Sequence, residues 1–306
     1  QTFKKRKAYY EGKAVKFHEF SEHRVDPICE HFGVCGGCKW QNMKYSQQLF
    51  FKHNEVKNHL QRIGKIELPD FEPILGSEKQ FFYRNKMEFS FSNSRWLTEA
   101  EIGSSEELDN KNALGFHIPK MWDKILDINK CHLQEDPSNA IRNEVREFAN
   151  ANGLTFFNPR AHEGLLRTLM LRTASTGEIM VLIQFFEDDQ ANRELLLDHL
   201  YAKFPQITSL QYVINNKAND TLYDTNIQLY KGRDYILEEM EGLKFSINAK
   251  SFYQTNSDQA YELYKITRDF AGLTGNETVY DLYTGTGTIA QFVSKKAKKV
   301  IGVESV

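Results

Sequence analysis

The stretch that decides the fold is Glu277–Ser305, "ETVYDLYTGTGTIAQFVSKKAKKVIGVES". Its pattern predicts a strand, a glycine-rich turn, a helix and a second strand, which together make one β-α-β unit. Gly285 and Gly287 allow the backbone to approach a nucleotide-like ligand closely. Glu304 ends the second strand about 20 residues further on, where a carboxylate can hydrogen-bond a ribose diol. The unit therefore predicts a Rossmann-like α/β domain that binds an adenosine-containing cofactor.

Two cofactor classes compete for this turn. The dinucleotide fingerprint requires a third glycine where this chain has Ala290, and it does not require an acid such as Asp281 before the turn. The pattern D-x-x-x-G-x-G, from Asp281 to Gly287, resembles instead the first motif of class I methyltransferases, which bind S-adenosylmethionine. We therefore expect S-adenosylmethionine, with a dinucleotide as the alternative.

The middle of the chain predicts a mixed antiparallel domain. Residues 81–92, "FFYRNKMEFSFS", alternate, with Tyr83, Asn85, Met87, Phe89 and Phe91 on the side predicted to be buried. Arg84 and Lys86 begin the other side, where they are predicted to contact RNA phosphates or, alternatively, only water.

Other segments complete this outline of elements. They are an amphipathic helix at 45–63 that could pack on the catalytic domain, a long loop at 94–112, a hairpin at 165–186 around "ASTGE", a helix at 188–204, a strand at 209–216 and a helix from Ser251 to Gly272. The last helix places its apolar face at Ala260, Leu263, Tyr264, Thr267, Phe270 and Ala271. We divide the chain into residues 1–24, a central domain at 25–250 and the start of the cofactor domain at 251–306.

Three of the chain's four cysteines lie within ten positions, in "CEHFGVCGGCKWQ" at 29–41. Cys29, Cys35 and Cys38 follow the spacing C-x5-C-x2-C, and Cys131 lies far away in "DINKCHLQ". Zinc sites usually have paired knuckles, whereas three close thiolates and a distant fourth are typical of an iron–sulfur cluster. Zinc, disulfides and four unrelated buried cysteines are the alternatives.

Composition sets further bounds. A net charge of -2 gives no global basic signature, so nucleic-acid contacts are expected from local patches such as "KKRKAYYEGK" at 4–13, which can also be a solvated tail. No apolar run approaches the ~18 residues that cross a bilayer. We expect a cytoplasmic protein without a membrane partner.

Five segments together resemble one family. "CEHFGVCGGCKWQ", "YRNKMEFS", "EGLLRTLMLRT", "SFYQTN" and "DLYTGTGT...GVE" occur in the order found in the RNA 5-methyluridine methyltransferases that carry an iron–sulfur cluster. The resemblance implies that Cys29, Cys35, Cys38 and Cys131 hold a 4Fe-4S cluster. It also implies that Gln254, Tyr283 and Glu304 contact S-adenosylmethionine.

The resemblance implies a mechanism as well. Carbon 5 of uracil is a poor nucleophile, so a thiolate first adds to carbon 6, carbon 5 then attacks the methyl group, and a carboxylate removes the carbon 5 proton. The base must be flipped out, which favours loops of structured RNA. We expect a monomer acting on ribosomal RNA, most plausibly 23S, with transfer RNA as the alternative.

The chain departs from the family at the catalytic residues. All four cysteines match the cluster ligands, so neither the nucleophile nor the base is identified here, and we expect a fragment of a longer enzyme that does not methylate RNA alone. Residues 1–24 are expected to be a remnant of a β-barrel RNA-binding domain. A radical enzyme is disfavoured because its loop has the spacing C-x3-C-x2-C. A non-catalytic RNA-binding module with an iron–sulfur or zinc site is the remaining alternative.

Overall fold

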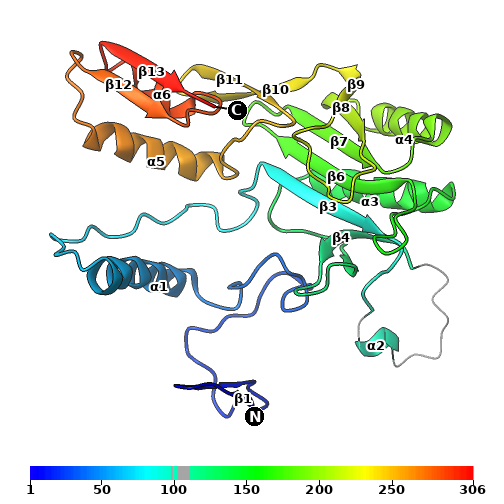
Figure 1. Cartoon of the computed structure of the whole chain (residues 1–306), viewed down its shortest axis with the longest axis horizontal. Coiled ribbons are helices and arrows are strands. Elements are labelled where there is room, and N and C mark those ends of the chain that lie inside the picture. The colour runs from blue at the N-terminus through cyan, green and yellow to red at the C-terminus, as the bar shows by residue number, and fades with distance from the viewer. Residues whose placement is uncertain (98, 103–110, 306) are drawn as a thin grey trace. The chain divides into compact units, whose positions relative to one another are not determined.

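The computed structural model describes residues 1–97, 99–102 and 111–305. Contacts divide the chain into two compact units. The first unit holds residues 1–32 and 38–76, and the second holds residues 33–37 and 77–306. Figure 1 labels their elements. The predicted domain boundaries after residues 24 and 250 stay predictions.

The first unit contains a hairpin and a helix. Strands β1 (Thr2–Lys5) and β2 (Tyr10–Gly12) pair antiparallel. Helix α1 (Tyr45–Asn58) continues as the π-helical turn η1 (His59–Ile63) and stops at Gly64, which confirms the helix predicted at 45–63.

The predicted apolar face of α1 is only partly covered. Leu49 and His53 are half-buried, whereas Val56 and Ile63 are exposed. Within the part of the chain that the structure describes, no side chain of α1 is fully buried. Its predicted packing on a catalytic domain stays a prediction.

The second unit is built on a seven-stranded sheet with the order β5-β4-β3-β6-β7-β8-β9 (Figure 1). All neighbouring strands are antiparallel except β7 and β8, which are parallel and are connected through helix α4. The bounds are β3 Lys86–Ser92, β4 Ala113–His117, β5 Ile125–Asp127, β6 Leu166–Thr173, β7 Ile179–Phe185, α4 Gln190–Lys203, β8 Ile207–Ile214 and β9 Gln228–Gly232. The predicted mixed antiparallel domain is confirmed.

Strand β6 is buried on both faces because each face meets a different core. Leu169 and Leu171 belong to the core shared with α4 and with helix α3 (Ser138–Ala151). Met170, between them, belongs to a second core on the other face. Alternate residues of a strand point to opposite faces, so this apolar run joins the two layers.

The C-terminal elements follow the sheet. These are the antiparallel hairpin β10 (Tyr235–Met240) and β11 (Leu243–Asn248), helix α5 (Ser257–Phe270), strands β12 (Thr278–Leu282) and β13 (Lys299–Val303), and helix α6 (Thr288–Ser294). Of these, β10, β11, α5 and α6 contribute side chains to the second core. Strands β12 and β13 are parallel, which confirms the predicted β-α-β unit.

Some details of the predictions were wrong. The strand at 81–92 begins only at Lys86, although Met87, Phe89 and Phe91 are buried as predicted. On α5, Leu263 and Phe270 are exposed, and the buried side chains are Ala260 and Tyr264.

The predicted loop at 94–112 is also not uniformly a loop. It contains the short helix α2 (Glu99–Ile102) and a bridge between Arg95 and Ile125, while residues 98 and 103–110 lie outside the described part.

Candidate functional site

The glycine turn between β12 and α6 is held by one carboxylate. Asp281 Oδ2 accepts hydrogen bonds from Thr284 Oγ1 at 2.8 Å and from the Ala290 backbone N–H at 2.9 Å. Asp281 therefore ties the end of the strand to the first turn of the helix. Gly285 and Gly287 have φ values of +55° and +73°, a region that favours glycine, and their close approach to a ligand stays a prediction.

Glu304 directly follows β13, as predicted. Its Oε2 accepts from the Gly285 N–H at 2.8 Å, and its Oε1 accepts from the Ser305 N–H at 2.8 Å. The carboxylate thus lies at the carboxyl ends of the two parallel strands, beside the glycine turn, where ligands of such sheets bind.

Tyr283 stands at the start of the same turn. It has φ +62° and a side chain that is 86% exposed. A positive φ is unusual for a residue other than glycine, and here it directs an uncovered aromatic ring to solvent. The ring is free to meet a ligand at this edge.

Gln254 lies between β11 and α5, on a segment fixed by its backbone. Asn85 Nδ2 donates to the Gln254 carbonyl and to Ser257 Oγ, both at 2.8 Å, and the Asn85 N–H donates to the Thr255 carbonyl at 2.8 Å. Arg172 donates to the Ser251 carbonyl at 2.6 Å. The Gln254 side chain itself is exposed. Neither Asn85 nor Arg172 was predicted to act here.

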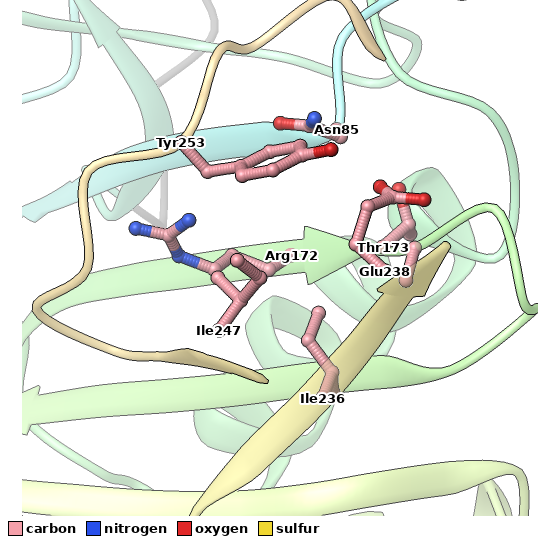
Figure 2. Close-up of a pocket in the computed structure, with 8 residues that line it drawn as sticks. Asn85, Arg172, Thr173, Ile236, Glu238, Ile247 and Tyr253 are labelled. Carbon is pink, nitrogen blue, oxygen red and sulfur yellow. The ribbon is translucent and has the colours of Figure 1, made fainter. Parts of the chain in front are cut away.

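A small cavity of about 10 Å³ lies under this segment (Figure 2). Among its lining residues, Asn85 Oδ1, Arg172 Nε and Tyr253 Oη are buried without a hydrogen-bond partner among the described residues. Burial lowers the pKa of Arg172 to about 10, and burial followed by the charge of Glu238 raises the pKa of Tyr253. The cavity has about the volume of one water molecule.

The four cysteines are divided between the units. In the first unit, burial and then the charge of Cys38 raise the pKa of the Cys29 thiol. In the second unit, the Gly37 N–H donates to Cys35 Sγ at 3.4 Å, and Cys35 packs against the core that contains Cys131. None of the four forms a disulfide among the described residues.

The second unit also fixes the backbone around its cysteines. Asn139 brackets Cys131, accepting from its N–H at 2.7 Å and donating to its carbonyl at 3.1 Å. A Cβ at Gly36 would lie 2.8 Å from the His117 carbonyl, so a glycine is needed there. Cysteine sulfurs and an N–H directed at sulfur fit an iron–sulfur donor set. However, no group of three or more His, Cys, Asp or Glu side chains in the described residues is arranged to hold a metal ion.

Arg84 and Lys86 lie at the start of β3. Lys86 Nζ is 2.5 Å from Glu88 Oε1, and Arg84 Nε donates to the Lys86 carbonyl at 3.4 Å. The charge of Lys86 is therefore partly balanced within the strand. Contact of either residue with RNA stays a prediction.

In the described part of the chain, no helix is long and apolar enough to cross a membrane.

Comparisons with known proteins place the chain in a family, although no protein-family model matches it. An uncharacterized RNA methyltransferase of Bacteroides thetaiotaomicron is 56% identical over 309 residues, with 100% of this chain and 68% of the relative covered. An uncharacterized RNA methyltransferase of Porphyromonas gingivalis is 54% identical over 314 residues and is covered to 67%. The chain thus spans about two thirds of the length of these relatives.

Among solved structures, the chain is similar to the Pyrococcus abyssi tRNA (uracil-54, C5)-methyltransferase in complex with S-adenosyl-L-homocysteine. The TM-score is 0.66 at 26% identity, and the match covers 90% of this chain and 60% of that one. Together with the relatives, this similarity shows that the chain belongs to the RNA methyltransferases.

Proposed function

We propose that the protein transfers a methyl group from S-adenosylmethionine to carbon 5 of a uridine in RNA. The observation that carries the proposal is the similarity to the archaeal tRNA (uracil-54, C5)-methyltransferase over 90% of the chain. The geometry of the β-α-β unit supports it independently, because an acid and a glycine turn meet at the carboxyl ends of parallel strands.

S-adenosylmethionine supplies the methyl group when it is bound. Glu304 would accept hydrogen bonds from its ribose hydroxyls, and the exposed Tyr283 ring would cover one face of the bound molecule. Asp281 keeps Gly285 and Gly287 in place. Asn85 would position the backbone of Gln254 for the same ligand.

The chemistry on uracil requires a thiolate nucleophile and a carboxylate base in the family that the sequence resembles. Because we assign all four cysteines of this chain to a metal centre, none is proposed as the nucleophile. The residues described above are proposed to bind and orient the cofactor and the RNA.

We further propose that Cys29, Cys35, Cys38 and Cys131 hold a 4Fe-4S cluster, with zinc as the alternative. The proposal rests on the ligand spacing and on the Gly37 N–H directed at Cys35. Such a centre would fix the cysteine loop to the segment that carries Cys131.

Ribosomal RNA is the proposed substrate because of the cysteine motif, since bacterial tRNA-specific members of the resembled family generally lack it. Transfer RNA is the second candidate, favoured by the name of the similar solved structure. We expect the protein to act as a cytoplasmic monomer.

The test uses the full-length protein and radiolabelled S-adenosylmethionine. Ribosomal and transfer RNA from cells lacking the gene are offered separately, and the labelled nucleoside is identified by mass spectrometry. We expect 5-methyluridine in ribosomal RNA. Label in a different nucleoside would refute the uracil-C5 assignment. Label only in transfer RNA would show that the substrate is transfer RNA and not ribosomal RNA. No label in either RNA would overturn the proposed function.

A further inference from the structure

A second cavity in the second unit, of about 400 Å³, lies where β3 ends and β6 begins. Its walls include Ser90 and Ser92 of β3, Thr168 of β6, and Asn219 and Asp220 after β8. This volume is within the range of about 300–1,000 Å³ typical of small-ligand sites. The cavity shares no lining residue with the small one under Tyr253.

The cavity opens on the sheet face opposite α3 and α4. Leu169 faces the core that contains those helices, so its neighbour Thr168 faces the other side. Ser90 pairs directly with Thr168 across the strands and lines the same space. Polar side chains of two strands thus form its floor.

One of these polar groups lacks a partner. Thr168 is only 8% exposed, and its Oγ1 has no hydrogen-bond partner among the described residues. Leaving a buried hydroxyl unpaired is unfavourable, so it indicates a group that a ligand or a bound water satisfies. Ser90 Oγ, by contrast, lies 3.3 Å from His117 Nε2.

The rim of the cavity carries an aromatic platform. Trp122 is 61% exposed, and the Arg160 guanidinium lies 5.6 Å from the centre of its ring. Arg160 Nε also donates to Asp123 Oδ2 at 2.7 Å. The indole thus lines the cavity beside a charged pair and is largely exposed, which leaves ring surface on which a planar group can stack.

The lining carries charges of both signs. The hydrogen bond from Arg160 holds the pKa of Asp123 below its usual range, so this carboxylate is ionised and paired with a guanidinium. Asp220 adds a second carboxylate to the lining, and Arg167 adds a cation. The lining is therefore not uniformly positive as an anion site would be, whereas a nucleobase is uncharged, stacks on indole and offers both donors and acceptors on its edge.

We infer that this cavity binds one unpaired base of the RNA substrate, separate from the base that is methylated. The inference rests on the proposed action on RNA. The base stacks on Trp122, and its edge reaches the Thr168 hydroxyl. Proteins commonly recognise single-stranded RNA loops by splaying out bases in this way.

Steady-state methylation by the full-length protein tests the inference, with total RNA from cells lacking the gene as the probe. Trp122→Ala should raise KM for RNA roughly 5- to 100-fold, the usual cost of losing one stacked base, and should leave kcat within about 2-fold. Thr168→Val should raise KM roughly 3- to 10-fold without lowering thermal stability, because it replaces an unpaired hydroxyl with a methyl group. The control is Tyr201→Ala, an exposed aromatic residue of α4 on the opposite face, and it should leave KM unchanged.

The outcomes separate this inference from the proposed function. If the parent methylates RNA and both cavity variants keep its KM, the cavity inference is overturned and the proposed function stands. If the parent methylates no RNA, the proposed function fails, and ultraviolet cross-linking of the same RNA followed by peptide mapping decides about the cavity. A cross-linked peptide containing Trp122 supports the cavity, and cross-links only to other peptides, or none, overturn it.

Discussion

At the scale of single residues, Glu304 and Asn85 act on the proposed cofactor site in different ways. Glu304 faces the glycine turn through its 2.8 Å contact with the Gly285 N–H. Asn85 acts from 169 positions away in sequence, through the carbonyl of Gln254. One residue is expected to touch the ligand, and the other to position a residue that does.

Replacing Glu304 tests the direct contact. In the full-length protein, Glu304→Ala should weaken S-adenosylmethionine binding by about 1–3 kcal/mol, because hydrogen bonds to a charged acceptor are lost. Isothermal titration calorimetry measures the change. Glu262→Ala, on the surface of α5 and paired only with Lys265 in the described contacts, is the control and should bind normally. Unchanged affinity in Glu304→Ala would refute the role.

Asn85→Ala tests the positioning contact. The substitution removes two side-chain hydrogen bonds of 2.8 Å, so we expect the free energy of unfolding to fall by about 1–3 kcal/mol. Urea denaturation measures this, and cofactor affinity should fall as well. Asn152→Ala, which loses a local bond to the Phe148 carbonyl at an exposed helix end, should change stability by less than about 0.5 kcal/mol. Equal affinity in parent and Asn85→Ala would argue against positioning.

The residues of the glycine turn could be predicted because they lie close together in sequence. Asp281, Gly285, Gly287 and Glu304 belong to one β-α-β unit, whose geometry is local. The alternation in residues 81–92 predicted that Asn85 lies on the buried face of a strand. In the structure Asn85 precedes β3, and its side-chain amide donates to the distant Gln254 carbonyl. A contact across 169 positions has no local signal, so sequence reasoning missed it.

At the scale of elements, the apolar pattern predicted the long apolar strands and missed strands that are short or carry charges. Strands β6 and β7 are continuous apolar runs and were predicted. β5 has only 3 residues, and β10 carries Glu238 and Glu239, so neither resembles a buried strand. The apolar stripe of α5 was predicted correctly as a helix, but periodicity alone does not reveal that Leu263 is uncovered.

The turn from α5 into β12 carries a pH-dependent contact. Glu277 accepts from the Thr274 hydroxyl at 2.6 Å and from backbone N–H groups of Thr274, Gly275 and Asn276, and these bonds, that of the hydroxyl first, lower its pKa to about 2. A lowered carboxylate pKa stabilises the fold above the unfolded value of about 4.3, and this contribution is lost as the pH falls towards 2.

Glu277→Gln should therefore lower the melting temperature at pH 7. The melting temperatures of the variant and the parent should converge as the pH falls from about 4.5 to about 2. Thermal melts across this range measure the difference. Glu78→Gln, at an exposed carboxylate, serves as the control and should follow the parent at each pH. A constant difference between Glu277→Gln and the parent down to pH 2 would contradict the assignment.

The start of β3 makes a prediction about RNA. Because Glu88 already balances Lys86, the double change Arg84→Ala with Lys86→Ala should flatten the salt dependence of RNA binding by closer to one unit of slope than two. Filter binding with ribosomal RNA at several salt concentrations gives the slope. Lys203→Ala on α4 should not alter it. If the double variant and the parent give the same slope, the two cations are only solvated.

At the scale of the whole molecule, the cysteines belong to both units, with Cys29 and Cys38 in the first and Cys35 and Cys131 in the second. The sequence contains the spacing of the cysteines and the family resemblance, so the residues that bind the metal could be predicted. The sequence does not contain the positions of the four sulfurs in space, so their convergence on one metal centre could not be predicted.

Metal analysis tests this centre. Full-length protein purified without oxygen should contain about four irons and four sulfides per chain and, after reduction, should give the paramagnetic resonance signal of a cluster. Cys131→Ser should lower both contents, because one ligand is lost. Protein purified in air controls for oxidative loss. If the protein purified without oxygen contains stoichiometric zinc and no iron, the four cysteines form a zinc site and not a cluster site.

The assignment of residues 33–37 to the second unit has a consequence for dissecting the protein. The chain passes between the units after Phe32, after Gly37 and again after Gly76. A protease that cut only between Gly76 and Ser77 would leave residues 33–37 on the N-terminal polypeptide, although Gly36 fits against His117 too closely for a side chain. The N-terminal product would carry the whole first unit, but the C-terminal product would lack residues 33–37 of the second unit. Limited proteolysis at this link should therefore yield a nicked molecule rather than two separable domains.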